Sequence, residues 1–250
     1  MIIIKSRDEI KKMAKASEIV AEALTVIRSV VAPDVTTKEL ERIAEEVIRS
    51  RGGRPAFKGY RGYPASICTS VNSEIVHGIP SDEVLLHEGD IVSVDLGVIY
   101  KGYIGDAAVT LPVGRISEET GRLLDITEQA LYEGIGKAVP GNRVSDISNA
   151  IQRFVESNGY SVVRAFVGHG VGRSLHEEPQ IPNFGPPGKG PVLKEGMTLA
   201  IEPMVNEGSY RVTILADGWT AKTADGKLSA HFEHTVLVTK DKPRILTKWA

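Results

Sequence analysis

A helix and strand pattern in the first half of the chain recurs in the second half at a constant offset of 107 residues. The paired positions are Ala32-Pro33 with Val139-Pro140, Glu39-Leu40 with Asp146-Ile147, Val47-Ile48 with Phe154-Val155, Ser50 with Ser157, Gly52 with Gly159 and Glu88-Gly89 with Glu195-Gly196. Because one offset holds across predicted helices and strands, we infer a duplicated helix-helix-strand-strand unit, with halves at about residues 6–115 and 116–240. The halves would pack as one α+β domain, residues 1–250, with pseudo-twofold symmetry.

Apolar residues recur at helical spacing in four segments. We expect helices over residues 6–30, 36–52, 117–139 and 144–157. The first opens with a capping box, Ser6-x-x-Glu9. The many charges of the second helix are interpreted as a solvent-exposed face.

The stretch from Asp95 to Asp106 places two carboxylates eleven residues apart in an apolar run punctuated by glycines. Residues 91–98 predict a buried strand, Lys101-Gly102 a tight turn and residues 103–111 the returning strand of a hairpin. Strand pairing would bring the two acids together, and both stay ionised in a poor dielectric only if a cation lies between them. A metal ion is the simplest such cation. The hairpin alone leaves open that one acid caps a turn while the other faces solvent.

The duplication adds two further carboxylates. Asp95 corresponds to Glu202 at the offset of 107, and Asp106 corresponds to Glu233 once an insertion of twenty residues is allowed. Four carboxylates would then face one axis. The single cysteine, Cys68, excludes an intramolecular disulfide and a thiolate zinc cluster, so any metal must be held by carboxylates and histidines.

Two further stretches carry candidate site residues. Residues 168–179 are rich in glycine and contain His169 and His176, and we expect the glycines to let the backbone approach a ligand. A phosphate cradle is the alternative, but the G-x-x-x-x-G-K pattern is missing. Residues 55–80, with aromatics, glycines and small polar residues before His77, have the composition of a pocket wall. Ordinary packing is the alternative for the tyrosines, and a structural role for His77.

Charge and hydropathy exclude several classes of function. The net charge is −2 and no run of five or six like charges occurs, so the chain has no electrostatic footprint for nucleic acid or an anionic membrane. No window approaches the roughly 18 apolar residues of a membrane span, and the apolar N-terminus is too short for a signal-peptide core. We therefore expect a cytoplasmic protein.

Four carboxylates with one or two histidines form a hard donor set that favours Mn²⁺, Fe²⁺ or Co²⁺ over a tetrahedral structural zinc. So many anionic ligands also favour two ions over one. Two divalent ions about 3.5 to 4 Å apart can share bridging carboxylates and hold a water that ionises near neutral pH. The residues alone therefore predict a metal-dependent hydrolase.

The chain resembles the type I methionine aminopeptidases of bacteria over essentially its whole length. The residues that carry the resemblance are His77, Asp95, Asp106, His169, His176, Glu202 and Glu233, with the motifs Gly168-His169-Gly170, His176-Glu177-x-Pro179 and Ile201-Glu202-Pro203. The resemblance implies the pita-bread fold, in which two helix pairs back a curved antiparallel sheet with a dinuclear metal site in its concavity. It also implies removal of the N-terminal methionine from nascent proteins whose second residue is small.

The resemblance assigns a role to each matching residue. The implied ligands of two divalent ions (Co, Mn, Fe or Zn) are Asp95, Asp106, His169, Glu202 and Glu233, with Asp106 and Glu233 bridging. Glu202 resembles the proton shuttle, His176 would bind the carbonyl or its oxyanion, and His77 would bind the scissile amide. The residues that would enclose the methionine side chain are Phe57, Tyr60, Tyr63, Cys68, Leu175 and Trp219. Asn72 and Ser229 fall where some members bind a monovalent cation.

This sequence departs from the family in the pocket. Leu175 stands where many members carry phenylalanine, and Phe57 where some carry cysteine, so the family does not fix the exact shape of the pocket. We expect a monomer and a transient contact with the ribosome.

Two other functions remain open. Xaa-Pro aminopeptidases and prolidases share the five ligands, but they usually bring an additional N-terminal domain, which we do not expect here. A pita-bread domain without catalysis, serving as a peptide- or RNA-binding module, would typically have lost metal ligands, whereas all five are present.

Overall fold

The computed structural model describes residues 1–248. Its helices are α1 (Arg7–Val30), α2 (Thr37–Ser50), α3 (Glu118–Ile135) and α4 (Val144–Ser157), with a 3-10 turn at Tyr60–Gly62. Its strands are β1 (Arg54–Pro55), β2 (Cys68–Val71), β3 (Glu74–Val76), β4 (Ile91–Tyr100), β5 (Tyr103–Pro112), β6 (Ser161–Val162), β7 (Val167–Gly170), β8 (Glu177–Pro182), β9 (Thr198–Ile201), β10 (Met204–Asn206), β11 (Val212–Ile214), β12 (Ala221–Thr223), β13 (Ser229–His231), β14 (His234–Leu237) and β15 (Arg244–Ile245).

The helices begin where the sequence predicts, but α2 ends two residues and α3 four residues earlier than predicted. The capping box of α1 is confirmed, since the Ser6 hydroxyl accepts from the Glu9 amide and the Glu9 carboxylate accepts from the Ser6 amide. α4 matches its predicted range. The prediction that the third helix runs to residue 139 is wrong, because α3 ends at Ile135 with Gly136 as its C-cap. Glycine is a weak helix former, and the proline that follows Val139 disfavours helix at that residue.

The predicted hairpin is confirmed, and it forms half of the central layer of strands. β4 and β5 pair antiparallel from Ile91↔Pro112 to Tyr100↔Tyr103. β4 also pairs β1 and β2, while the second large sheet has the order β15-β14-β9-β7-β8. The two sheets meet along β5 and β14, where the Glu233 amide donates to the Ala108 carbonyl at 2.9 Å. Two of the predicted acids, Asp106 and Glu233, therefore lie at the seam between the sheets.

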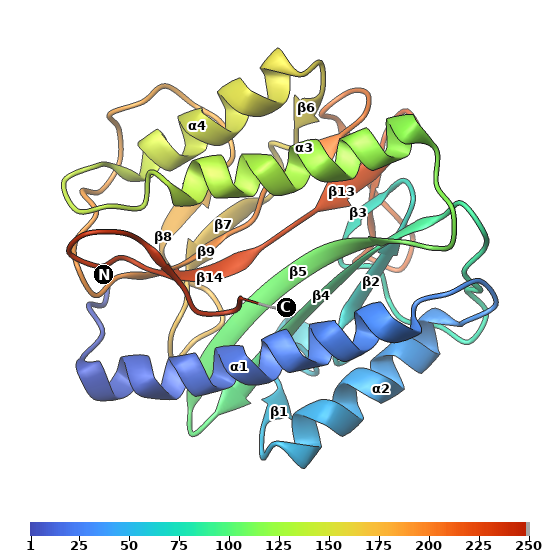
Figure 1. Ribbon diagram of the computed structural model, residues 1–250, viewed down its shortest axis with the longest axis horizontal. Coiled ribbons are helices and arrows are strands. Elements are labelled where there is room, and N and C mark those ends of the chain that lie inside the picture. Colours follow the sequence, from blue (N-terminus) through green and yellow to red (C-terminus); the bar gives the residue numbers. More distant parts are fainter. Residues whose placement is uncertain (249–250) are drawn as a thin grey trace.

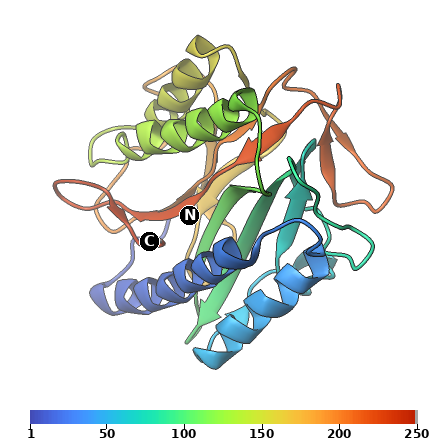
Figure 2. The same ribbon diagram turned by 45° about the vertical axis from the view of Figure 1, so that its right-hand side comes forward.

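The helices form a layer against these strands. Figures 1 and 2 show α1 and α2 together beside the first sheet, and α3 and α4 together beside the second. Apolar side chains from all four helices and both sheets are buried in one core, with Leu24, Ile48, Leu131, Ile151 and Val94 among them. Each such side chain contributes about 1.5–3 kcal/mol through burial. The core packs against one face of the strands, and polar side chains lie on the opposite face.

Equivalent contacts occur in both halves. The isolated bridges Thr36↔Leu85 and Arg143↔Val192 are related by the offset of 107 residues. The inferred duplication and its boundaries stay a prediction, which these contacts support.

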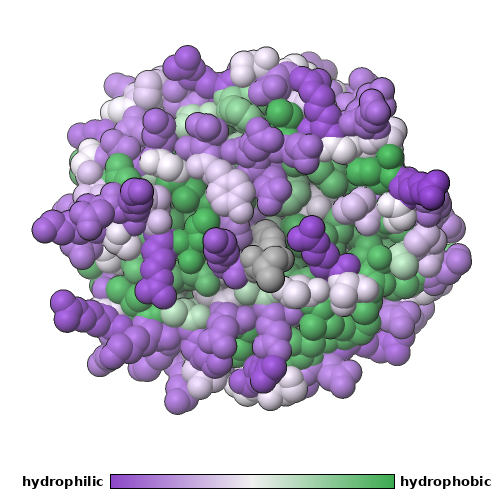
Figure 3. Space-filling view, viewed as in Figure 1, coloured by the Kyte–Doolittle hydropathy of each residue, from purple (hydrophilic) through white to green (hydrophobic). Residues whose placement is uncertain are grey.

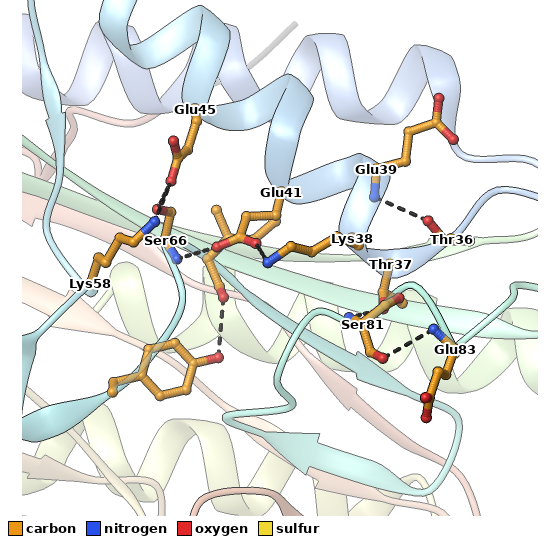
Figure 4. A network of polar contacts seen from close by, with 12 residues as sticks. Thr36, Thr37, Lys38, Glu39, Glu41, Glu45, Lys58, Ser66, Ser81 and Glu83 are labelled. Atoms are coloured by element: carbon orange, nitrogen blue, oxygen red, sulfur yellow. Dashed lines mark hydrogen bonds and ion pairs between the residues drawn. The ribbon is translucent and has the colours of Figure 1, made fainter.

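One expectation about α2 is wrong, because part of its charged surface faces inward. Glu41 is 3% exposed, and its carboxylate accepts from the Ser66 amide at 2.7 Å and from the Lys38 ammonium at 2.6 Å. Figure 4 shows this network between α2 and the segment that leads into β2. A buried carboxylate is tolerated there because it is paired and hydrogen-bonded. The network anchors the backbone just before Cys68.

One face of the surface can be followed in the space-filling view. On the face seen in Figure 3, hydrophilic side chains predominate and apolar residues show between them. Within residues 1–248, none of the helices combines the length and the apolarity that crossing a bilayer requires.

Candidate functional site

One cavity of about 550 Å³ gathers the predicted site residues. Its lining includes Phe57, Tyr60, Tyr63, Cys68, His77, Asp95, Asp106, His169, Leu175, His176, Glu202, Trp219 and Glu233. These residues come from both halves of the chain and from both large sheets. The structure thus brings together every predicted metal, catalytic and pocket residue, and it leaves the predicted monovalent-cation residues outside the cavity.

The first two acids are placed by the register of the hairpin. Asp95 lies opposite Ala108, and Asp106 lies opposite Gly97, so the two carboxylates are diagonal neighbours on one face. A Cβ at Gly97 would approach Phe57 to 2.8 Å and the Asp106 Oδ1 to 3.3 Å. Glycine opposite Asp106 therefore leaves room for the carboxylate and for the aromatic ring.

The second half supplies an imidazole and two more carboxylates. The Nε2 of His169, in β7, lies 3.3 Å from the Oε1 of Glu202 and 4.0 Å from the Oδ2 of Asp106. The His169 Nδ1 lies 2.9 Å from the Gly170 carbonyl oxygen, which fixes Nδ1 as the donor. Nε2 is then the bare nitrogen, as a metal-ligating histidine requires. Asp106, His169 and Glu233 each offer a ligand atom within 4.8 Å of the others.

The glycines beside His169 serve the sheet rather than a ligand, contrary to the expectation from the sequence. A Cβ at Gly168 would meet the Ala200 carbonyl oxygen at 2.4 Å, and one at Gly170 would meet the Glu178 carbonyl oxygen at 2.2 Å. The backbones of β9 and β8 close in on both sides of β7. This close approach brings His169 and Glu202 together.

Burial dominates the electrostatics of the four carboxylates. Burial, together with the Asp106 charge, raises the pKa of Asp95 well above its usual value. Burial raises the pKa of Asp106 to about 7. The pKa values of Glu202 and Glu233 are also raised, first by burial and then by the neighbouring acids. Burial lowers the pKa of His169 to about 4, so the imidazole is neutral at pH 7.

The donor set fits a divalent cation. In the part of the chain that the structure describes, Asp95 Oδ1, Asp106 Oδ1 and Glu233 Oε1 are buried without a hydrogen-bond partner. Leaving a buried acceptor unpaired costs about 1–3 kcal/mol, and more for a charged group. Several carboxylates can remain ionised together in such a cavity when a cation neutralises them. Carboxylate oxygens and one bare imidazole nitrogen suit Mn²⁺, Fe²⁺ or Co²⁺.

The stability of the metal-free protein should fall as the pH rises from about 7 to 9. In this window the carboxylates of the unfolded chain are ionised, whereas burial holds the pKa values of the four folded acids above their ordinary range, that of Asp106 at about 7. The folded state binds more protons, so each step up in pH favours unfolding. Below about pH 6.5 the buried histidines act in the opposite direction, because their lowered pKa values favour folding as the pH rises.

Urea denaturation of chelated protein at several pH values measures this dependence. Protein saturated with Mn²⁺ is the control, and its stability should not fall over the same range, because its carboxylates are already ionised. A metal-free protein whose stability rises from pH 7 to 9 would contradict the raised pKa values.

His176 lies at the exposed rim of the cavity and is oriented by Tyr60. The Tyr60 hydroxyl lies 2.7 Å from the His176 Nδ1. If the phenol donates this bond, Nε2 carries the imidazole proton and can donate it to a substrate oxygen. Burial first, and then the neighbouring His169, lower the pKa of His176 to about 3, so the ring is neutral.

A buried ion pair supports the loop that carries Leu175 and His176. The Lys5 ammonium lies 2.7 Å from the Glu177 Oε2, with side-chain exposures of 3% and 7%. The other oxygen of Glu177 accepts from the Arg173 amide at 2.8 Å. The N-terminal segment thereby fixes the loop that faces the cavity.

The apolar end of the cavity is held by Tyr63. Its hydroxyl donates to the Gly78 carbonyl at 2.9 Å or to the Ile67 carbonyl at 3.1 Å, and its ring packs edge-on against Trp219 with centroids 5.2 Å apart.

His77 has a φ of 63°, a left-handed conformation that is uncommon for a residue other than glycine. Such conformations cluster at functional sites, where the surrounding structure imposes them.

Asn72 and Ser229 are brought together, but through the backbone. The Ser229 amide donates to the Asn72 carbonyl at 3.0 Å. The Asn72 side chain is already used, because it donates to Asp90 at 2.7 Å and accepts from the Ile91 amide at 3.0 Å. The monovalent-cation site stays a prediction.

Sequence reasoning missed a buried histidine of the cavity. His231 is 1% exposed and lines the cavity with the predicted residues. The sequence does contain a signal for His231, because this residue stands two positions before Glu233 and both side chains face the cavity. The alternation of side chains in an extended chain could have indicated it.

The comparisons with known proteins agree with this geometry. The model of metallopeptidase family M24 matches residues 11–240. A methionine aminopeptidase of Clostridium perfringens is 56% identical over 247 residues, covering 99% of this chain and 99% of that protein. The solved structure of a methionine aminopeptidase from Thermotoga maritima superposes with a TM-score of 0.98 at 52% identity, covering 99% of this chain and 100% of that one.

A more distant structure shares the fold. Prolidase from Pyrococcus furiosus superposes with a TM-score of 0.81 at 27% identity, and the match covers 99% of this chain but 66% of the prolidase. The predicted α+β architecture is therefore confirmed as the pita-bread fold that these enzymes share.

Proposed function

Because the chain belongs to metallopeptidase family M24 and, within it, to the type I methionine aminopeptidases, we propose that a pair of divalent metal ions carries its removal of N-terminal methionine. The observation that carries this proposal is the set of buried carboxylate oxygens without partners among residues 1–248. The residues that would hold the ions are Asp95, Asp106, His169, Glu202 and Glu233. When bound, such ions polarise the peptide carbonyl and lower the pKa of a water to near neutrality.

The bridging role suits Asp106 and Glu233. They lie at the seam between the sheets, where the two halves of the chain meet, and both carboxylates are almost fully buried. Asp95 lies on the first-half side of this seam, and His169 with Glu202 on the second-half side. If Asp106 and Glu233 were shared by both ions, Asp95 would remain as a ligand on one side, and His169 with Glu202 on the other.

The histidines and Glu202 would act on the scissile peptide bond. His176, with Nδ1 occupied by Tyr60, would donate from Nε2 to the carbonyl oxygen and stabilise the charge that develops there. His77, beside Phe166 with ring centroids 5.4 Å apart, would contact the scissile amide. Glu202 would accept a proton from the attacking water and pass it to the leaving amine, a role open to an ionised carboxylate held beside the scissile bond.

The methionine side chain would occupy the end of the cavity between Tyr63, Cys68 and Trp219. This end is apolar and anchored by the hydrogen bonds of Tyr63, so it would select by shape. Leu175 is 5% exposed there, and Phe57 closes the side near Gly97. A narrow apolar slot fits an unbranched thioether better than a branched chain.

A peptide panel tests this function. Met-Ala and Met-Gly peptides should lose methionine rapidly, while Leu-Ala should be cut roughly 10- to 200-fold more slowly, because apolar fit discriminates by only about 1 to 3 kcal/mol per methylene-sized change. Nα-acetyl-Met-Ala should be cut more slowly still, since it lacks the basic amine that the carboxylate-rich end and its ions would recognise. Met-Leu and Met-Lys peptides should also be slow if the second-residue site beside His77 is small.

The panel includes its own counter-test. Ala-Pro peptides are the matched substrates for the proline-specific enzymes of this fold, and they should remain uncut. Release of alanine from Ala-Pro with methionyl peptides left intact would reverse the assignment.

The proposed substrates in the cell are nascent polypeptides, whose N-terminal methionine is exposed before folding. The protein would act on them as a monomer. We also propose that the protein acts in the cytoplasm and contacts the ribosome transiently.

A further inference from the structure

His231 is a buried histidine at the carboxylate-rich end of the cavity, and hydrogen bonds hold its backbone in place. It ends β13 and pairs with Met204 of β10. Its amide donates to the Thr110 hydroxyl at 2.8 Å, and its carbonyl accepts from the same hydroxyl at 2.8 Å. Since β10 begins two residues after Glu202, this pairing sets His231 beside that carboxylate.

The imidazole is oriented toward Glu202 without a hydrogen bond of its own. Within the described residues, neither ring nitrogen of His231 has a hydrogen-bond partner. Its Nε2 lies 3.9 Å from the Oε2 of Glu202. A neutral imidazole carries one donor and one acceptor nitrogen, so this ring can donate one hydrogen bond.

The two oxygens of Glu202 face different histidines. Oε1 lies 3.3 Å from the Nε2 of His169, on the side where the proposed metal ligands meet. Oε2 faces His231. A metal-ligating carboxylate is normally held by a hydrogen bond to its remaining oxygen, and loss of such a partner typically costs about 10- to 100-fold in metal affinity or activity.

We propose that His231 positions Glu202, donating a hydrogen bond from Nε2 to Oε2 so that Oε1 stays directed at the ion shared with His169. This inference rests on the proposed metal centre. Closing the gap from 3.9 Å to hydrogen-bond length takes a movement of about 1 Å, within the reach of a small carboxylate rotation. His231 is thus a positioning residue that reaches the ion through Glu202.

Mn²⁺ titration of the metal-free full-length chain by calorimetry tests the role. In His231→Leu, which removes the donor at similar volume, one of the two Mn²⁺ sites should weaken by about 10- to 100-fold, and kcat should fall by a similar factor with little change in KM. His231→Gln, whose amide nitrogen can take the place of Nε2, should restore both. His231→Asn, whose shorter amide cannot reach that place, should not.

A matched control separates this effect from the loss of any buried histidine. His234 is as buried as His231 but does not line the cavity, so His234→Leu should lower the melting temperature without weakening Mn²⁺ binding. Equal Mn²⁺ affinity in His231→Leu and wild type would overturn the positioning role. Loss of one Mn²⁺ from the stoichiometry in both the Leu and Gln variants would also overturn it, and would identify His231 as a direct ligand.

The test also distinguishes this inference from the proposed function. Wild-type protein that binds no Mn²⁺, or whose binding is unchanged in Asp106→Asn, would refute the metal centre itself. Wild-type binding that depends on Asp106 but not on His231 would refute the positioning role alone.

Discussion

Exhaustive chelation should abolish the release of methionine, and adding Mn²⁺, Fe²⁺ or Co²⁺ should restore it. The reason lies in the cavity, where four carboxylates from both sheets lie together and three of their buried oxygens lack a partner within residues 1–248. Without cations, burial raises the pKa values of these groups, so each carboxyl keeps its proton to a higher pH than an exposed one. The measurement is the initial rate on Met-Ala peptide before and after reconstitution.

The control for this experiment is Asp106→Asn, which removes the proposed bridging carboxylate. This variant should regain little activity at metal concentrations that restore the wild type. Full activity in wild-type protein from which all metal has been removed would refute the two-metal mechanism.

Glu202→Gln should lower kcat by about 10²- to 10⁴-fold with the fold intact. Glutamine keeps the size of the side chain but removes the negative charge and the ability to take up and return a proton. Because Glu202 also faces His169 at 3.3 Å, the variant should bind the second ion more weakly as well. The measurements are steady-state kinetics at saturating Mn²⁺ and calorimetric titration of the same protein.

His176→Ala is the matched comparison, because it removes a group proposed to touch substrate but no metal ligand. Its kcat should fall by about 10²- to 10³-fold, as for the loss of an oxyanion donor, while its Mn²⁺ affinity should match the wild type. Wild-type turnover in either variant would show that the role of that residue has been misassigned.

Much of the fold could be predicted because its signals are local or periodic. Three such signals are the capping box at Ser6, the apolar period of the helices and the tight turn at Lys101-Gly102. Each depends on residues a few positions apart, so it can be recognised from the sequence alone. The repeat at an offset of 107 then related the two halves without any contact information. The end of α3 was predicted wrongly because apolar spacing continues beyond Gly136, where backbone preference stops the helix.

The sequence by itself determined the chemical types at the site. The chain offers one cysteine, four acids at corresponding positions of the repeat, and histidines in glycine-rich segments. These donors restrict the kinds of metal site that the chain could form. These are properties of composition and spacing, and they hold before any contact is known.

Only the tertiary structure decided how these groups are oriented and which others join them. His231 lies beside Glu202 because β13 pairs with β10, and Lys5 supports the His176 loop across 172 residues of sequence. Glu41 turned inward because the Ser66 amide and Lys38 satisfy it, and the glycines around His169 admit neighbouring strands. Such placements depend on the packing of segments that are distant in the chain, and no local pattern records them, because the same residue types satisfy many packings equally well.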